Sequence, residues 1–230
     1  MSVHKPLSRV NLTIRVLGLF LLVFPLFGAV FFLPAGELSY WEAWVYLAVL
    51  FVPMVFALVY FLIFSPALLE RRMRMREKEA EQQLIVKLAS IAILLVYLLP
   101  GFDHRFHWSS VPIWLVVIAD VLVFSGYAFM VLVMRENPYA GRTVEVEPDQ
   151  TVVTTGPYAV VRHPMYLGVL LLYVFSPLAL GSYWSMIPAL LLMGLLIARI
   201  TNEERVLLKE LNGYREFTER VRWRIIPGIW

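Results

Sequence analysis

The chain has 230 residues, of which 60% are hydrophobic and 16% are charged, and its mean hydropathy is +0.72. A soluble domain is usually about 45–50% apolar, so this composition excludes an ordinary water-soluble protein and predicts a polytopic membrane protein. The absence of cysteine excludes disulfides, thiolate metal sites and cysteine nucleophiles. A net charge of +3 is too small to favour nucleic acid as a partner.

Six apolar segments are candidate membrane spans, because a spanning helix needs roughly 20 predominantly apolar residues. The last two are shorter than the others, and Gly181 and Ser182 alone separate them, which predicts a tight helical hairpin that need not cross the whole bilayer. The expected fold is therefore an all-α polytopic membrane protein with about six transmembrane helices. These segments lie at about 15–33, 41–64, 84–100, 111–134, 166–181 and 183–200.

Lysine and arginine residues set the expected orientation. With the N-terminus inside, the outer loops lie near 34–40, 101–110 and 181–182, and Arg105 is the only Lys or Arg in them. By the positive-inside rule, both termini are expected to be cytoplasmic. Basic residues on the inner side include Lys5 and the cluster Arg-Arg-Met-Arg-Met-Arg-Glu-Lys at 71–78, which also suits anionic membrane lipids.

The C-terminal part carries the longest polar stretches. We expect residues 1–134 to form the N-terminal transmembrane helices and residues 135–230 to carry the chemistry. The segment 135–165 combines extended-looking residues at 151–154 with turn signals at 147–149 and at Gly156-Pro157. After the last span, apolar residues recur at steps of three or four, which predicts an amphipathic helix along the inner membrane face. These residues are Leu207, Leu211, Tyr214, Phe217 and Val221.

A cationic pair precedes the fifth apolar segment. Pro164 suits the first turn of a helix, where its missing N–H costs nothing. Arg162 and His163 then lie just before the N-terminus of that helix, where free backbone donors favour an anion. The group is a candidate site for a carboxylate or a phosphate. Alternatively, Arg162 is an ordinary positive-inside anchor and His163 a helix cap.

A second group of ionisable residues ends the last span. Arg199 and Glu203 are four residues apart, so they share a helix face and can pair. Ionisable groups at the edge of a span usually face the protein interior or a wet cavity, although Arg199 could simply set topology. Because a tight hairpin brings its two ends together, we expect His163 and Glu203 to be neighbours. The sequence therefore predicts a cytoplasmic pocket that holds cations and carboxylates.

These motifs occur in an order that resembles a known family. Residues 150–153 (Gln-Thr-Val-Val) precede Gly156-Pro157-Tyr158, and residues 162–168 (Arg-His-Pro-Met-Tyr-Leu-Gly) follow. Arg199, Glu203-Glu204 and the closing Ile225-Ile226-Pro227 complete the pattern. In this order the sequence resembles the isoprenylcysteine carboxyl methyltransferases and their bacterial relatives, which share a fold with the phospholipid methyltransferases. The resemblance covers residues 135–230.

The resemblance implies an S-adenosylmethionine-dependent methyltransferase in a membrane, here the bacterial inner membrane. The cofactor would lie between the last two spans and the C-terminal segment. Arg199 and Glu203 would be catalytic, with Arg199 facing the substrate and Glu203 holding the amino group or ribose side of the cofactor. No metal is implied. The implied cofactor-binding residues are Gln150, Thr151, Val152, Val153, Tyr158, His163, Pro164, Met165, Tyr166 and Glu203.

The resemblance specifies the methyl donor and leaves more than one class of methyl acceptor open. A lipophilic small molecule or lipidated acceptor would arrive sideways between helices, and the resemblance favours a carboxylate as the methylated group. A phospholipid, another amine or a thiol is the alternative, and for an amine Glu203 or Glu204 could act as base. Two more distant readings stay open, namely a sterol-type reductase that binds a nicotinamide dinucleotide and a transporter or scaffold.

Three further residues were weighed for function. Asp120 lies in the middle of an apolar span, where a carboxylate is a functional candidate, although a packing hydrogen bond or a protonated state explains it equally well. His104 and His107 resemble metal ligands, but the sequence places no third ligand near them. We therefore predict no metal site.

Overall fold

The computed structural model describes residues 8–73, 80–144, 146–147 and 149–230, and within these residues all regular structure is helical. Five helices are long and apolar enough to cross a membrane, namely α1, α2, α4, α5 and α7, and α6 is a shorter apolar helix. The prediction of an all-α polytopic membrane protein is confirmed. Lys5, residues 74–78 of the basic cluster and Pro148 lie outside the described residues. The helices are α1 (Arg9–Ala35), α2 (Trp41–Phe64), α3 (Pro66–Arg72), α4 (Ala80–Phe106), α5 (Ile113–Glu136), η1 (Gly156–Ala159), α6 (Pro164–Ala179), α7 (Met186–Glu210) and α8 (Tyr214–Arg220).

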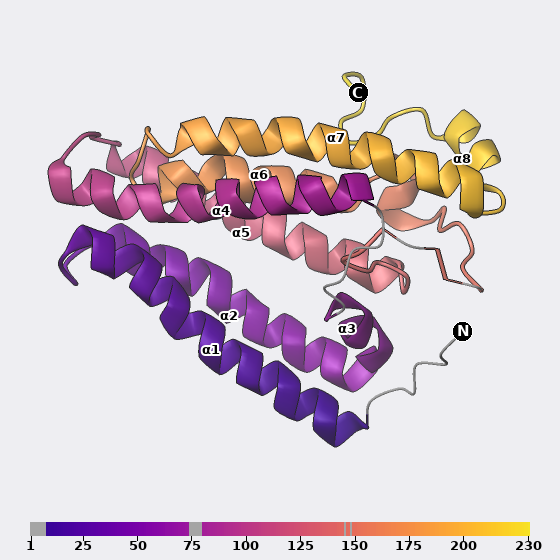
Figure 1. The fold of residues 1–230 in the computed structure, drawn as a ribbon, viewed down its shortest axis with the longest axis horizontal. Helices are drawn as coiled ribbons and strands as arrows, with labels where there is room; N and C mark the ends of the chain where they lie inside the picture. The colour runs from indigo at the N-terminus through magenta and orange to yellow at the C-terminus, as the bar shows by residue number, and fades with distance from the viewer. Residues whose placement is uncertain (1–7, 74–79, 145, 148) are drawn as a thin grey trace.

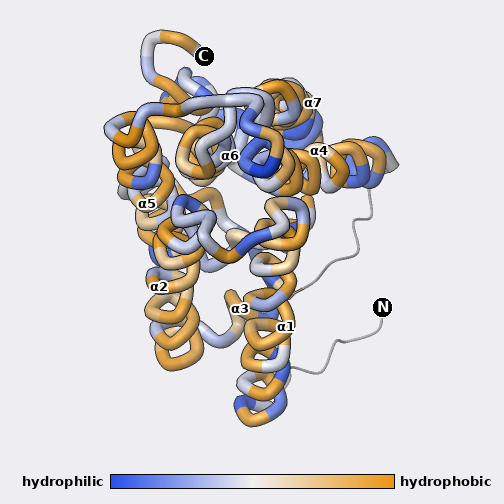
Figure 2. The backbone as a smooth tube through the Cα atoms, turned by 90° about the vertical axis from the view of Figure 1, so that its left-hand side faces the viewer, coloured by the Kyte–Doolittle hydropathy of each residue, from blue (hydrophilic) through white to orange (hydrophobic). Residues whose placement is uncertain are grey.

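The helices form one bundle whose two ends differ. α4 to α7 pack together, and α1 and α2 form a hairpin that packs on them through α1 against α4 and α2 against α5. Figure 2 shows the hairpin set apart from the other four helices in the view along the bundle. In Figure 1 this hairpin diverges from them toward the end that carries α3, the segment 137–163 and α8. We call this end the site end.

α5 and α6 approach each other closely at two facing glycines. A Cβ atom at Gly126 would lie 2.8 Å from the carbonyl oxygen of Gly168, and one at Gly168 would lie 2.4 Å from Cγ of Met130. Only a residue without a Cβ atom allows helix backbones to come this close, as in small-residue contacts between membrane helices. Gly168 follows Pro164 by one helical turn. The contact therefore fixes where α6 begins, at the site end.

The predicted helical hairpin is present, but its two arms differ in length. Gly181, with φ +72°, makes the turn, and α6 has 16 residues as the sequence suggested. α7 has 25 residues and ends at Glu210, so the helix that contains the predicted span 183–200 continues beyond it into the predicted amphipathic region. The residues after Ile200 include Glu, Arg, Lys and Leu, which are good helix formers, and they continue the helix.

The amphipathic C-terminal face is also present, although it is broken. Gly213, with φ +82°, lies between α7 and α8, and the chain changes direction there. The apolar residues of the predicted face, from Leu211 to Val221, pack into one cluster with Val133 of α5 and Tyr158 of η1. The C-terminal segment thus covers the site end of the bundle.

We expect Gly126→Ala to lower stability, because the added methyl group would overlap the α6 backbone. Overpacking of this kind typically costs about 1–3 kcal/mol. Thermal unfolding of the detergent-purified protein measures the effect. Gly194→Ala in α7 is the matched control, because nothing lies within 4 Å of a Cβ atom there. Equal midpoints for the two variants would contradict the assigned close contact.

Candidate active site

A cavity lies at the site end, between the segment 137–153, the start of α6, the end of α7 and α8. It brings together ten of the eleven predicted site residues, and Pro164 is the exception. Pro164 begins α6 immediately beside the lining residues His163 and Met165. We call this space the polar cavity. The predicted residues that line it are Gln150, Thr151, Val152, Val153, Tyr158, His163, Met165, Tyr166, Arg199 and Glu203.

One wall of the polar cavity is extended backbone. Residues 151–153 have no regular secondary structure. Within the described part of the chain, their backbone N–H and C=O groups make no hydrogen bond to protein. Buried or half-buried backbone groups normally have partners, so this edge can bind a ligand that carries its own donors and acceptors. A purine base is such a ligand.

The hairpin brings the ends of α6 and α7 together as predicted. His163 is buried, with 6% of its surface exposed. Its Nδ1 lies 3.9 Å from Oε1 of Glu203, and its Nε2 lies 3.3 Å from Oε1 of Glu204. The expectation that His163 and Glu203 are neighbours is confirmed. Because its ring faces two carboxylates, His163 lies on the acidic side of the site.

Arg199 and Glu203 are joined through a tyrosine. Nε of Arg199 donates to the hydroxyl oxygen of Tyr166 at 2.9 Å, and that hydroxyl donates to Oε2 of Glu203 at 2.5 Å. Arg199 also donates to Oε1 of Gln82 and to the carbonyl oxygen of Arg142. These bonds hold the guanidinium of Arg199 in one place in the wall of the polar cavity.

Glu204 is the centre of a buried charge cluster. Its side chain is 8% exposed, and its carboxylate accepts hydrogen bonds from Nε of Arg162 and from Nε of Arg224, each at 2.7 Å. Arg162 also donates to the carbonyl oxygens of Val221 and Arg222. A carboxylate so occupied is poorly placed to act as a base. Glu204 therefore joins α7 to the start of α6 and to the C-terminal segment.

The backbone ahead of α6 is likewise occupied. The N–H of Arg162 donates to the carbonyl oxygen of Trp223, and that of His163 donates to the carbonyl oxygen of Arg224. These two backbone donors hold the C-terminal segment in place, and the side chain of Arg162 contributes to the same contact.

Two features of the polar cavity were missed from the sequence. The hydroxyl group of Tyr214 is buried in the wall and has no hydrogen-bond partner among the described residues. Asn137 donates from Nδ2 to the hydroxyl oxygen of Tyr158 at 2.9 Å. Burial raises the pKa of Tyr158 to about 12, so it is a neutral phenol at physiological pH. The hydroxyl group of a tyrosine on an otherwise nonpolar helix face was the available signal for Tyr214.

A second, apolar cavity adjoins the polar one. It lies among α4, α6 and α7, and its walls include Ile85, Ile93, Leu192 and Leu196. We call it the apolar cavity. Six residues line both cavities and form the boundary between them, namely Gly141, Arg142, Thr143, Met165, Tyr166 and Arg199.

The other candidate residues lie away from both cavities. Asp120 is 6% exposed, and its Oδ1 has no partner among the described residues. About 25 Å of helix rise separates it from the C-terminal end of α5 at the site. His104 contacts Glu37 at 2.7 Å, at the opposite end of the bundle. Neither residue joins the candidate active site.

Glu204→Gln should destabilise the protein, because Arg162 and Arg224 would lose the carboxylate that binds them. Removing one partner of a buried ion pair typically costs about 3–5 kcal/mol. Thermal unfolding tests this, with Glu203→Gln as the neighbouring control, whose carboxylate is more exposed at 23%. If both variants unfolded at the same temperature, Glu204 would not hold the C-terminal segment.

Comparison with known proteins gives two matches. Residues 114–213 match the family model described as phospholipid methyltransferase. The fold is similar to the solved structure of the eukaryotic intramembrane Ras methyltransferase ICMT (isoprenylcysteine carboxyl methyltransferase), with a TM-score of 0.52 and 17% sequence identity. That match covers 97% of this chain and 88% of the other. No curated protein matches the sequence. The match to residues 114–213 and the shared fold together support the predicted resemblance to the isoprenylcysteine carboxyl methyltransferases and the phospholipid methyltransferases.

Proposed function

We propose that this protein transfers a methyl group from S-adenosylmethionine to a lipophilic acceptor, with a carboxylate as the favoured methyl-accepting group. The observation that carries the proposal is the junction of the two cavities, where Arg199 and Tyr166 line both a polar and an apolar space. A methyl donor and a lipid-like acceptor need such a pair of spaces that meet at one point.

The residues of the polar cavity suit S-adenosylmethionine. The unpaired backbone edge at 151–153 offers donors and acceptors to an adenine. Glu203 is an anionic group for the ammonium of the donor, and the Tyr214 hydroxyl offers one more polar contact. The expected contact between His163 and the carboxylate of the donor stays a prediction, because the ring of His163 faces Glu203 and Glu204.

Bound S-adenosylmethionine supplies a methyl group on a positively charged sulfur. That methyl group would pass to a carboxylate oxygen of the acceptor, with the neutral thioether as leaving group, and this transfer would need no proton acceptor on the protein. The task of the protein is to align the two groups and to exclude water. Arg199, fixed by Tyr166, Gln82 and the backbone at Arg142, would orient the carboxylate.

An amine acceptor would need a different arrangement, because an ammonium must lose a proton before it attacks. Glu203 would be the base, and it already accepts the hydroxyl of Tyr166. Glu204 is bound by two arginines. Methylation of a carboxylate would require neither Glu203 nor Glu204 to accept a proton.

The proposed reaction also implies where the site lies in the cell and which part of the chain binds each substrate. We propose that the site end faces the cytoplasm, where S-adenosylmethionine is made, with both termini on that side of a bacterial inner membrane. Residues 135–230 would bind the donor, and residues 1–134 would supply most of the remaining membrane helices. The acceptor would enter the apolar cavity from the lipid phase.

Calorimetric titration of S-adenosylmethionine into the detergent-purified protein tests the proposal first, with His163→Ala alongside. We expect saturable binding to the wild-type protein and loss of binding in the variant, provided that the variant keeps the wild-type unfolding transition. No binding to well-folded wild-type protein would refute the proposed donor site.

Glu203 and Arg199 should separate donor binding from transfer. Glu203→Gln removes the charge that faces the ammonium and is expected to abolish binding of S-adenosylmethionine. Arg199→Ala should keep that binding and lose transfer of labelled methyl groups into a membrane lipid extract. Wild-type affinity in Glu203→Gln would remove the role that we assign to Glu203.

Tyr214→Phe gives an independent test of the cavity wall. Because the hydroxyl has no protein partner, its removal should leave thermal stability unchanged or slightly higher. If the hydroxyl binds the donor, the affinity for S-adenosylmethionine should fall about fivefold, as for loss of one hydrogen bond of about 1 kcal/mol. Equal affinity in the variant and the wild type would exclude Tyr214 from the donor site.

A further inference from the structure

The apolar cavity has an unusual distribution of charge. Its walls are mostly aliphatic, yet three arginines line it, namely Arg72, Arg142 and Arg199, and no aspartate or glutamate is among the lining residues in the part of the chain that the structure describes. Arg142 and Arg199 stand at the boundary with the polar cavity, whereas Arg72 comes from α3. A guanidinium group in an apolar space is costly without an anion, so the contacts of Arg72 decide whether it can bind a negatively charged ligand.

Arg72 has fewer partners than the other arginines nearby. Its Nη1 donates to the carbonyl oxygen of Ala140 at 3.2 Å and contacts Sδ of Met165 at 3.6 Å. Nε and Nη2 have no hydrogen-bond partner, and the side chain forms no ion pair, among the residues that the structure describes. A guanidinium has five N–H donors, arranged to bind a carboxylate through two of them.

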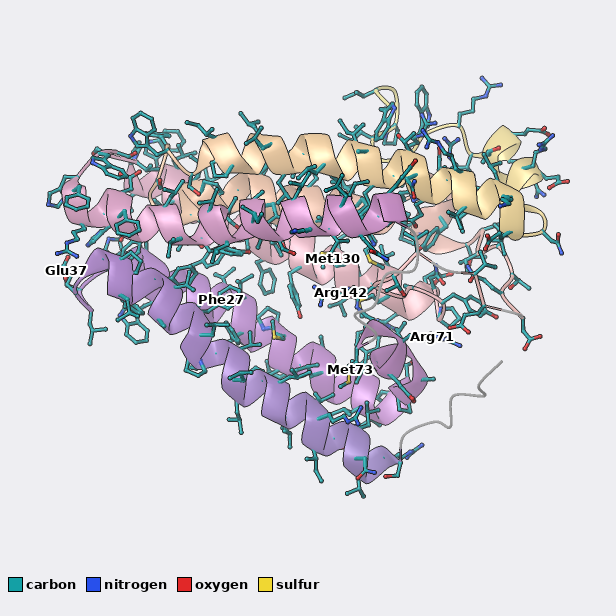
Figure 3. The ribbon with its side chains drawn as sticks, viewed as in Figure 1. Phe27, Glu37, Arg71, Met73, Met130 and Arg142 are labelled. Carbon is teal, nitrogen blue, oxygen red and sulfur yellow. The ribbon has the colours of Figure 1, made fainter. Side chains whose placement is uncertain are left out.

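The electrostatic surroundings of Arg72 also favour binding of an anion. Burial lowers the pKa of the Arg72 guanidinium, and the nearby charge of Arg142 lowers it further. Figure 3 shows Arg142 in the region between α3 and the layer of α4 to α7. The guanidinium still stays charged, because a free arginine loses its proton only far above physiological pH. The two cations therefore repel each other, and a shared anion would relieve the repulsion.

Its neighbour Arg71 differs in each respect. Arg71 donates to the carbonyl oxygen of Pro138 at 2.6 Å, pairs with Glu147 at 3.6 Å and lies over the ring of Tyr139. It lines neither cavity. In Figure 3 it lies on the side of α3 that faces the segment 137–150. Arg71 thus anchors that segment, whereas Arg72 faces the apolar cavity.

We propose that Arg72 binds the anionic head of the methyl acceptor and makes the site selective for a lipophile with a carboxylate over one with an amine. The proposal rests on the proposed function, since it concerns the acceptor of the same reaction. It adds a specificity-determining residue from outside residues 114–213, which match the family model. Arg72 would bind one carboxylate oxygen, and Arg199 would bind the oxygen that lies nearer the methyl donor.

The test compares two probes that differ in one charge. Spin-labelled stearate and its methyl ester carry the same chain, and at alkaline pH only stearate is anionic. The immobilised fraction of each probe is measured by electron paramagnetic resonance on the full-length protein in phosphatidylcholine nanodiscs. For the wild type we expect stearate to bind about tenfold more strongly than the ester, as for one charge-assisted hydrogen bond.

Arg72→Gln should remove most of this preference, and Arg71→Gln should keep it. A wild-type preference in Arg72→Gln would overturn the proposal, and so would equal binding of both probes to the wild type. If Arg72→Gln does not fold, Arg72→Lys replaces it, because a single ammonium keeps the charge and loses the paired donors. Its preference should then fall below that of the wild type, and an unchanged value would overturn the proposal.

The outcome is separable from that of the proposed function. Binding of S-adenosylmethionine is measured by calorimetry on the same samples and does not require Arg72, which lies outside the polar cavity. Donor binding together with equal probe binding would refute the role of Arg72 alone. Absence of donor binding would refute the proposed function, whatever the probes do.

Discussion

The carboxylate of Glu204 is the interaction on which the candidate site depends. It is shared by Arg162 ahead of α6 and Arg224 in the C-terminal segment, and His163 lies beside it. Three stretches that are distant in sequence therefore meet at one buried anion. Such a cluster is costly to desolvate and is stable only when every member is paired. Its complete pairing explains how a loop-rich region at the end of a helical bundle can keep one geometry.

A second constraint sets where this cluster forms. The glycine contact between α5 and α6 fixes the height of Pro164, and the Gly181 turn fixes α7 relative to α6. Arg71 and Arg72 then tie α3 to the backbone at Pro138 and Ala140. The N-terminal hairpin thus reaches the site through α3 and is more than a membrane anchor. Two cavities result, one closed by polar segments and one by apolar helix faces.

Much of this arrangement could be read from residue patterns, and the exceptions have physical causes. The apolar segments, the hairpin and the nearness of His163 to Glu203 follow from hydropathy and topology, and the structure confirms them. α7 continues beyond its apolar part because the charged residues there are good helix formers, and hydropathy marks the end of an apolar segment but not the end of a helix. The roles of Arg72 and Glu204 depend on which partners surround each charge in space. Adjacent residues, such as Arg71 and Arg72 or Glu203 and Glu204, look equivalent in the sequence and face different environments in the fold.

The charge of the apolar cavity, whose described lining residues include three arginines and no acidic residue, bears on product release. In the proposed reaction, methylation would turn a carboxylate into an uncharged ester, so arginines that attract the acceptor would lose their hold on the product. The ester is also more soluble in lipid than the anion was. In the proposed turnover, the walls of the apolar cavity would therefore bind the charged acceptor but would not bind the uncharged product. The chemistry itself would open the way for the next acceptor, without any moving gate.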